Sequence, residues 1–250
     1  MPGSPTYVLA IDTATDICSV AVLHGDRLIE LAERVGSRHS ECVLPMVEAA
    51  LAAAALKLGD VDLFAFGAGP GSFTGLRIAC GVCQGLAYGK QKRVVGIGNL
   101  RALAANAFES VNAGDLLLAA VDARMSEAYC AIYRRDESIS EIRSPALERP
   151  KSLTALAFEA GVNIVAGNAI TTFADAWPGD KRWVELPDVS SSAGAIAKLA
   201  RMDAARGLSV APANAVPVYV RDHIALTIEE RRRSSMAAQA DITSVASRPS

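Results

Sequence analysis

The sequence predicts a two-lobed α/β protein in which both lobes use the same arrangement of strands and helices. Short apolar runs typical of strands alternate with longer runs at helical spacing along most of the chain. Two stretches, LAIDTATDICSVAVLHGD ending at Asp26 and LAAVDARMSEAYCAIYRRD ending at Asp136, align without a gap at a shift of 110 residues. This shift places Asp12 on Asp122, so each copy is a strand ending in Asp, a turn and a second strand. We interpret the echo as a duplicated hairpin that begins each sheet; the alternative is the general likeness of any two β-hairpins.

The expected elements follow in order along the chain. In the first half, strands are predicted at residues 7–11, 18–23, 27–35, 61–66 and 94–97, and helices at 40–58, 74–88 and 100–108. Ser40 is expected to cap the first helix, and Pro45 to kink its first turns or delay its start. In the second half, strands are predicted at 116–121, 127–133 and 138–143, followed by a helix, a strand and a helix that ends at Arg206.

These elements suggest a division into an N-terminal α/β lobe, residues 1–105, and a C-terminal α/β lobe, residues 106–222. The helix at 191–206 is expected to pack back on the first lobe. The last residues, 231–250, lack periodicity and are predicted to be a disordered tail.

Composition and charge exclude several classes of protein. The longest apolar stretches are interrupted before they reach membrane-spanning length, and the first residues lack the pattern of a secretory signal. Five cysteines without framework spacing favour a reducing compartment, so a cytoplasmic location is expected. The net charge is −2, and residues 231–250 hold four Arg and one Asp, so residues 1–230 carry −5. A protein that binds nucleic acid without a partner usually has a basic surface, so this mildly acidic net charge argues against that class.

Five segments carry a family resemblance: IDTATDICSVAV, RHSECVLPMVEAAL, GAGPGSFTGLRIACGVCQGLA, VDARMSEAYCAIY and PVYVRDHIA. In this order they resemble the TsaB (YeaZ) family over roughly residues 6–230, and GPGSFTGLR is the most specific of them. The resemblance implies the actin/Hsp70/sugar-kinase-like (ASKHA) fold with duplicated mixed-sheet lobes. It also implies kinship with TsaD, which installs threonylcarbamoyl on an adenosine beside the tRNA anticodon.

The glycine-rich turn at residues 67–75 does not match a phosphate-binding motif. A Walker-type loop requires a lysine, and none lies between Lys57 and Lys90, while a dinucleotide turn requires Gly where Ser72 stands. We expect the turn to be structural, with Ser72 or Thr74 capping the next helix. A residual nucleotide contact is the alternative. Its candidate residues are Asp12, Thr13, Gly71, Ser72 and Asp122, of which the two aspartates equally suit turn capping.

Neither a metal site nor a catalytic residue is expected. The resemblance implies that catalytic relatives hold a metal through two histidines four residues apart on a helix, whereas this chain has Asn99 and Leu103 at the matching positions. Cys80 and Cys83 have no second pair nearby and are read as packing residues. No cofactor is assigned to this chain alone, and ATP or ADP at the junction of a complex remains the alternative.

Two predicted helices carry too few polar residues to form a solvent-exposed polar face. From Cys42 to Leu56 only Glu48 is charged, and from Gly75 to Tyr88 only Arg77 and Gln84 are polar. A helix that is apolar nearly all round must be covered on all sides, which predicts a protein partner or cover from elsewhere in the chain. The expected interface residues, pointing away from the sheet, are Met46, Ala50, Ala53, Arg77, Cys80, Cys83, Gln84 and Ala87.

The resemblance and the residues together predict a non-catalytic scaffold or activator subunit for threonylcarbamoyl modification of tRNA. Its expected partners are a TsaD-like catalytic subunit, a TsaE-like ATPase and, in isolation, a second copy of itself, with tRNA reached through the complex and no membrane. The alternatives are an autonomous metal-dependent, glycoprotease-like peptidase, an ATP-dependent transferase and an ATP-binding, chaperone-like module. Missing metal ligands and the missing lysine argue against the two enzymes.

Overall fold

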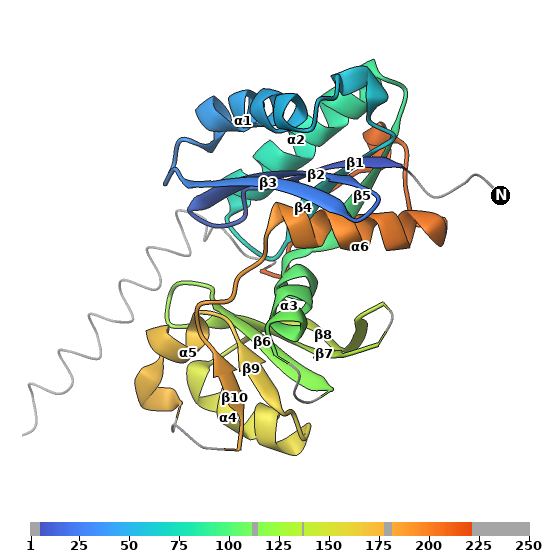
Figure 1. Ribbon diagram of the computed structural model, residues 1–250. Helices are drawn as coiled ribbons and strands as arrows, with labels where there is room; N and C mark the ends of the chain where they lie inside the picture. The colour runs from blue at the N-terminus through green and yellow to red at the C-terminus, as the bar shows by residue number, and fades with distance from the viewer. Residues whose placement is uncertain (1–5, 112–114, 137, 178–181, 222–250) are drawn as a thin grey trace, which may run out of the picture. The chain divides into compact units, whose positions relative to one another are not determined.

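Two five-stranded mixed sheets form the framework of the protein, whose computed structural model describes residues 6–111, 115–136, 138–177 and 182–221 (Figure 1). In the first sheet the strand order is β3-β2-β1-β4-β5. Its strands are β1 (Tyr7–Asp12), β2 (Ile17–His24), β3 (Arg27–Arg34), β4 (Leu63–Gly69) and β5 (Arg93–Gly98). In the second sheet the order is β8-β7-β6-β9-β10. Its strands are β6 (Leu116–Asp122), β7 (Ala128–Arg134), β8 (Ser140–Glu148), β9 (Ile164–Ala166) and β10 (Val184–Leu186).

Each sheet lies between helices, which explains the continuous apolar runs of its central strands. The helices are α1 (His39–Ala53), α2 (Phe73–Gly89), α3 (Asn99–Ser110), α4 (Pro150–Glu159), α5 (Ala169–Thr172) and α6 (Ala193–Ala205). Helices α1 and α2 share one apolar core with the first sheet, and α6 covers the other face of that sheet (Figure 1). In the second sheet α4 and α5 contribute to one core and α3 to another.

The two sheets repeat one topology, as the internal echo predicted. In both, the first three strands are antiparallel neighbours, and the last two add in parallel beside the first strand. Asp12 and Asp122 each end the first strand of their sheet. Gly69 at the end of β4 and Gly167 directly after β9 both have positive φ, a conformation that favours glycine. The predicted two-lobed ASKHA-like fold with duplicated mixed sheets is therefore confirmed.

Helix boundaries differ from the expectation at α1. The helix begins at His39, and its N-cap is Arg38 without a side-chain hydrogen bond, so the prediction that Ser40 caps it is wrong. Pro45 lies inside α1 and does not delay its start. The helix ends at Ala53 because Ala55 has a positive φ and Leu58–Asp60 forms a separate 3₁₀ turn. At α2, Ser72 is the N-cap and accepts a hydrogen bond from the Gly75 backbone N–H, so of the two expected caps, Ser72 and Thr74, it is Ser72 that caps the helix.

Helix α6 follows the last strand of the second sheet and packs on the first, whereas α3 follows the last strand of the first sheet and packs on both. Helix α6 comes after β10 yet contacts β1 and β2, whereas α3 comes after β5 and contacts β6 and β7. A boundary near residue 105 therefore stays a prediction, since α3 packs with residues of both sheets. The predicted tail at 231–250 lies outside the described residues. Within the described part, none of the helices is long and apolar enough to cross a membrane.

Candidate functional site

The turn between β1 and β2 docks on the glycine-rich turn that joins β4 to α2. The hydroxyl of Thr13 donates a 2.7 Å hydrogen bond to the backbone carbonyl of Gly75. The backbone N–H of Ser72 donates to the carbonyl of Ala14 at 2.8 Å. Thr13 is fully buried and Ala14 nearly so. The space beside the glycine turn is therefore filled by this chain.

Two glycines in the turn are explained by this close approach. A Cβ at Gly71 would lie 2.7 Å from the Cβ of Ala14, nearer than Cβ contacts in real proteins. A Cβ at Gly75 would overlap the backbone carbonyl of Thr13. Glycine is required here so that one turn can pack on the other.

The backbone donors of the turn are largely used within the protein. Gly69 N–H donates to the Asn99 side-chain oxygen at 2.7 Å, and Gly75 N–H to the Ser72 hydroxyl at 3.3 Å. Leu76 N–H donates to the Ser72 carbonyl at 2.8 Å. A phosphate cradle requires free N–H groups at the helix start, and there the N–H groups of Ser72 and Gly75 are already bonded within the protein.

A buried polar network centres on the Asp12 carboxylate. The Asn99 amide donates to both carboxylate oxygens, at 3.0 and 3.1 Å. The Ser191 hydroxyl donates at 2.5 Å, and Ala14 N–H at 3.0 Å. Asp12 and Asn99 are both buried. This network joins β1, the start of α3 and the segment before α6, and it uses the Asp12 carboxylate for structure.

Asn99 has a structural role in this network that the sequence did not predict. In the sequence it stands out only as a position without a histidine, whereas in the structure its amide bridges Asp12 and the end of β4. Asn99 stands between the apolar strand β5 and the apolar start of α3. A polar residue in such a position can indicate a buried polar pair. The neighbouring position of interest, Leu103, is buried in the core between α3 and the second sheet.

Asp122 has a different environment from Asp12. It is half-buried, and its carboxylate accepts a bond from the Arg124 N–H at 2.8 Å and pairs with the Arg124 guanidinium at 3.4 Å. Its own N–H donates to Asn168 at 2.9 Å. The two aspartates are equivalent in topology, yet none of the hydrogen bonds or ion pairs in the described ranges links them. Groups of three or more His, Cys, Asp or Glu suited to a metal are likewise absent from those ranges.

The cysteines of α2 are packing residues with protonated thiols. The Cys80 thiol contacts the Ala215 carbonyl at 3.4 Å, and the Cys83 thiol contacts the Ala65 carbonyl at 3.1 Å. Burial raises the pKa of both thiols. The reading of this pair as core residues agrees with these contacts.

Most of the predicted interface residues face the core, which corrects the expected orientation of the helices. The buried members are Met46, Ala50, Cys80, Cys83 and Ala87. Gln84 is half-buried and donates to the carbonyls of Pro212 and Ala215, whereas Ala53 and Arg77 are exposed. The error in α1 is one of phase: the buried stripe follows Val43, Met46, Val47, Ala50 and Leu51, and Leu44 is 47% exposed. An apolar helix without polar residues on one side gives no marker for its phase.

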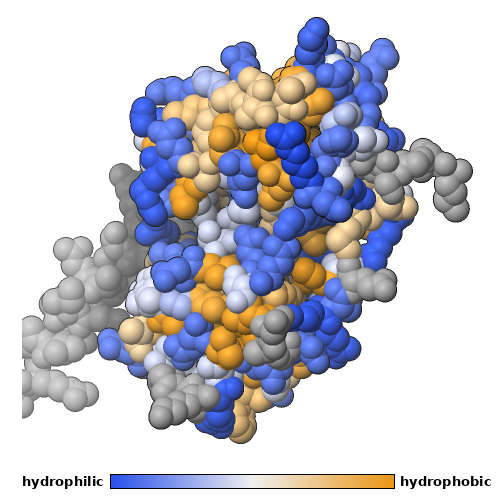
Figure 2. Space-filling model, viewed as in Figure 1, coloured by the Kyte–Doolittle hydropathy of each residue, from blue (hydrophilic) through white to orange (hydrophobic). Residues whose placement is uncertain are grey.

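The outer side of α1 and α2 nevertheless carries mostly apolar or small residues. Figure 2 shows orange and light-orange residues gathered at the top of the view, where Figure 1 places α1. We define the α1–α2 face by its exposed residues: Glu41, Leu44, Glu48, Ala49, Ala52, Ala53, Thr74, Arg77, Gly81, Gly85 and Tyr88. A Cβ at Gly81 or Gly85 would meet nothing within 4 Å, so neither glycine is required by contacts of this chain.

The C-terminal segment of the described chain runs along the other side of α2. Val210 bridges to Val94, and Val218 N–H donates to the Ala68 carbonyl at 2.7 Å. Tyr219 packs on Phe73 with ring centroids 5.2 Å apart and accepts a 3.0 Å hydrogen bond from Arg77 Nε. This segment covers one flank of α2 and leaves the α1–α2 face open.

Comparisons with known proteins agree with this architecture. A family model described as TsaD, tRNA N6-adenosine threonylcarbamoyltransferase, matches residues 31–242. The chain is 35% identical over 232 residues to the tRNA threonylcarbamoyladenosine biosynthesis protein TsaB of Escherichia coli strain K12, covering 87% of this chain and 96% of that protein. It is 42% identical over 134 residues to the TsaB protein of Haemophilus influenzae, covering 54% of this chain and 56% of that protein.

A solved structure gives the same result. YeaZ from Pseudomonas aeruginosa superposes with a TM-score of 0.77 at 35% identity, covering 86% of this chain and 99% of that one. Fold and packed turn together define a two-lobed protein of the ASKHA class. Within that class, the chain belongs to the TsaB (YeaZ) family.

Proposed function

We propose that this chain is a non-catalytic scaffold or activator subunit in the threonylcarbamoyl modification of the adenosine next to the tRNA anticodon. Relatives named tRNA threonylcarbamoyladenosine biosynthesis protein TsaB support the pathway. The observation that carries the non-catalytic role is the packed turn: Thr13 and Ala14 occupy the space beside the glycines, and Asp12 is bound by neutral donors. A nucleotide or metal used by this chain alone would have to displace these contacts.

The α1–α2 face supports the scaffold role. Helices of a soluble protein rarely expose a contiguous apolar patch unless it is an interaction site. Exposed glycines inside a helix cost about 1 kcal/mol each relative to alanine, a cost that close approach of a partner helix offsets. We assign this face to a TsaD-like catalytic subunit and, in isolation, to a second copy of the chain. A TsaE-like ATPase completes the complex, and ATP or ADP and the tRNA are assigned to its junction.

The decisive experiment is a reconstituted transfer assay with purified components. The chain alone, with tRNA and divalent metal, is expected to show no threonylcarbamoyl transfer and no peptide cleavage. Added to a TsaD-like subunit and a TsaE-like ATPase, it should restore transfer, and Ala53→Glu should abolish that restoration. Turnover by the highly purified chain alone would overturn the proposal in favour of an autonomous transferase or a glycoprotease-like peptidase.

A further inference from the structure

The two helices of the α1–α2 face carry opposite charges. The charged residues of α1 are Glu41 and Glu48, both exposed, and the one charged residue of α2 is Arg77. Neither carboxylate takes part in the hydrogen bonds or ion pairs found among the described residues. Both acids are therefore available to a basic group outside the chain.

Arg77 is held in a fixed orientation. Its guanidinium lies 3.9 Å from the centre of the Phe73 ring, and its Nε donates to the Tyr219 hydroxyl at 3.0 Å. These two contacts restrain the side chain and leave its outer two nitrogens for another acceptor. A planar guanidinium fixed in this way suits a carboxylate, which it can bind with two parallel hydrogen bonds.

The shapes of the two helices are also unlike. In the middle of the face, Leu44 of α1 protrudes with 47% of its surface exposed, whereas α2 presents Gly81 and Gly85, above which nothing of this chain lies. The large exposed side chain of α2, Tyr88, lies at the far end of that helix. A large side chain on one helix and a hollow on the other complement each other when α1 of one copy lies on α2 of another. Packing α1 on α1 or α2 on α2 would pair large with large and hollow with hollow.

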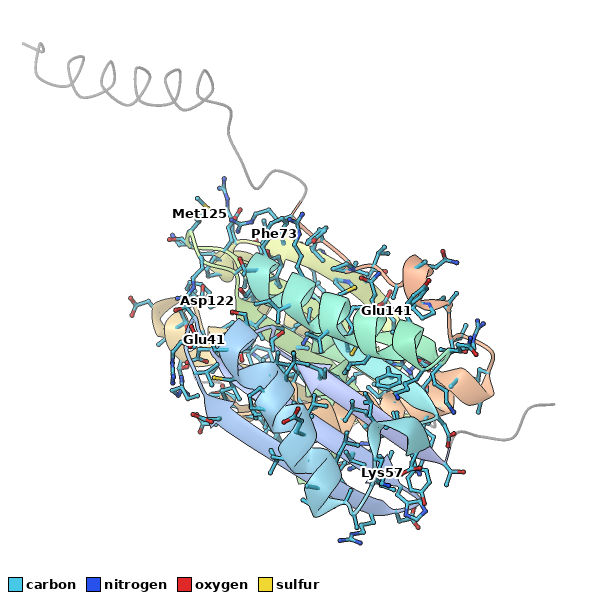
Figure 3. The ribbon with its side chains drawn as sticks, turned by 90° about the horizontal axis from the view of Figure 1, so that it is seen from above. Glu41, Lys57, Phe73, Asp122, Met125 and Glu141 are labelled. Atoms are coloured by element: carbon cyan, nitrogen blue, oxygen red, sulfur yellow. The ribbon has the colours of Figure 1, made fainter. Side chains whose placement is uncertain are left out.

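Chain topology fixes the direction of this contact. Strands β3, β4 and β5 run the same way, because β3 and β1 are both antiparallel to β2, and β4 and β5 add in parallel. Helices α1 and α2, which connect them in turn, therefore run in the same direction. Figure 3 shows Glu41 and Phe73 at the starts of the two helices on the same side, and Lys57 at the opposite end.

A twofold axis that lies in the face, parallel to the two helices and midway between them, then places α1 of each copy on α2 of the other without reversing direction. In that arrangement Arg77, fifth in α2, lies near Glu41, third in α1 of the second copy. Both positions lie in the first two turns of helices that begin on the same side of the face, so a long arginine side chain suits this contact.

Resting on the face assigned above, we propose that Arg77 binds Glu41 of a second copy of this chain. The two symmetric ion pairs would select the pairing of α1 on α2 and would set the register of the dimer. Charged pairs at an interface rim fix orientation and suppress wrong partners more than they add affinity. Phe73 and Tyr219 are the positioning residues for the guanidinium.

Reciprocal charge reversal tests this pairing. Arg77→Glu and Glu41→Arg, each alone, place like charges together twice per dimer and should raise the dimer dissociation constant at least about tenfold. Mixing the two variants creates a heterodimer with both pairs matched, so it should form with an affinity within about threefold of the unmutated chain. Analytical ultracentrifugation and native mass spectrometry distinguish the three species, and circular dichroism checks that each variant is folded.

Controls separate this proposal from the face itself. Arg206→Glu reverses an exposed charge on the C-cap of α6, outside the face, and should leave the dissociation constant unchanged. If Ala53→Glu dissociates the dimer while Arg77→Glu does not, or if the mixed variants fail to associate preferentially, the ion pair is wrong and the face stands. An unmutated chain that sediments as a monomer at high concentration overturns the pairing and the homodimer together, but leaves the assay with the catalytic subunit as a separate test of function.

Discussion

At Gly75 the absence of a Cβ atom allows the turn between β1 and β2 to pack on the turn after β4. The carbonyl of Thr13 occupies the space that a side chain at this position would need, and the Thr13 hydroxyl bonds to the Gly75 carbonyl. By contrast, Gly81 lies in the same helix with open space above it. Glycine is therefore required by contacts within the chain at position 75, whereas no contact within the chain requires it at position 81.

Substitution of the two glycines is expected to have opposite effects on stability. Gly75→Ala should lower the free energy of unfolding by about 1–3 kcal/mol, because the added methyl overlaps backbone that cannot move freely. Gly81→Ala should raise it by about 1 kcal/mol through helix propensity. Urea unfolding of both variants measures the difference, and equal effects would contradict the close-packed turn.

The cysteines offer a second test at the scale of single residues. Burial raises the pKa of Cys18 and Cys130 to about 11, and it also raises the pKa of Cys80 and Cys83. The thiolate is the reactive form, so at pH 8 iodoacetamide should label the partly exposed Cys42 and spare the other four. Mass spectrometry of the native and urea-unfolded protein measures this, and rapid native labelling of Cys18 would contradict the burial.

The same shifts have a consequence for stability at high pH. Above the ordinary thiol pKa of 9.0 the unfolded chain loses protons that the folded chain retains. The free energy of unfolding should therefore fall as the pH rises from about 9 towards 11.

At the scale of elements, the orientation of α1 and α2 changes what two interface variants are expected to do. Ala53 is exposed on the outer side of α1, whereas Cys83 is fully buried against β4 and donates to the Ala65 carbonyl. A charge at Ala53 meets water in the monomer and becomes buried only when a partner covers the face. A charge at Cys83 is buried in the monomer itself.

Ala53→Glu should therefore abolish association while the monomer keeps its stability, and Cys83→Arg should unfold the monomer. Burying an unpaired charge costs several kcal/mol in both cases, but in different states of the protein. Sedimentation reports association, and thermal unfolding reports the fold. An unchanged melting temperature for Cys83→Arg would contradict the burial of Cys83 on the side of α2 that packs on the first sheet.

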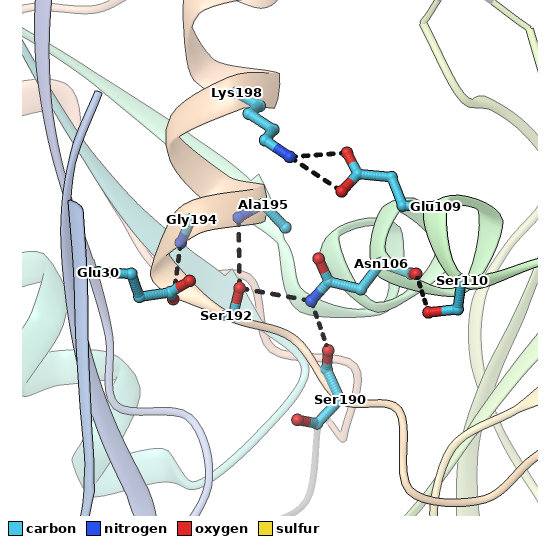
Figure 4. Close-up of polar contacts among 9 residues, drawn as sticks. All are labelled: Glu30, Asn106, Glu109, Ser110, Ser190, Ser192, Gly194, Ala195 and Lys198. Atoms are coloured by element: carbon cyan, nitrogen blue, oxygen red, sulfur yellow. Dashed lines mark hydrogen bonds and ion pairs between the residues drawn. The ribbon is translucent and has the colours of Figure 1, made fainter. Parts of the chain in front are cut away.

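At the scale of the whole molecule, contacts between α3 and α6 tie together the elements that follow the two sheets. Arg101 on α3 pairs with Asp203 on α6 at 2.6 Å, with side-chain exposures of 19% and 8%, and also donates to the Ser138 carbonyl. Figure 4 shows further contacts of these helices, including the Lys198–Glu109 pair and the bonds from Asn106 to Ser190 and Ser192. Together with the Asp12–Asn99 network, these contacts connect the elements of the first sheet to those of the second. We call this set of contacts between α3 and α6 the α3–α6 seam.

Breaking the Arg101–Asp203 and Lys198–Glu109 ion pairs of the α3–α6 seam should lower the free energy of unfolding by very different amounts. Arg101→Met leaves Asp203 buried without its partner and should lower the free energy of unfolding by about 3–5 kcal/mol. Lys198→Met removes an exposed pair, with side-chain exposures of 40% and 58%, and should cost less than about 1 kcal/mol. Chemical denaturation of both variants measures the contrast, and similar costs would show that the seam does not depend on the buried pair.

Sequence alone determined the duplicated fold, because strands and turns leave local patterns that repeat at a fixed shift. The apolar runs at β1, β2, β6 and β7 and the aspartates that end β1 and β6 were visible without coordinates. The motif comparison predicts a structural role for the glycine turn, which stays a prediction, and Ser72, one of the two residues expected to cap α2, does cap it.

Only the tertiary structure decided how the site is filled and which side of each helix is free. Asn99 reaches Asp12 across 87 positions of the chain, a contact that no local pattern encodes. Likewise, the phase of α1 depends on which side chains fit the first sheet: Met46 and Ala50 pack inward, and Leu44 is left outside. In a helix without polar residues on one side, the side that becomes buried is decided by packing against residues distant in the chain. No local sequence pattern therefore indicates which side that will be.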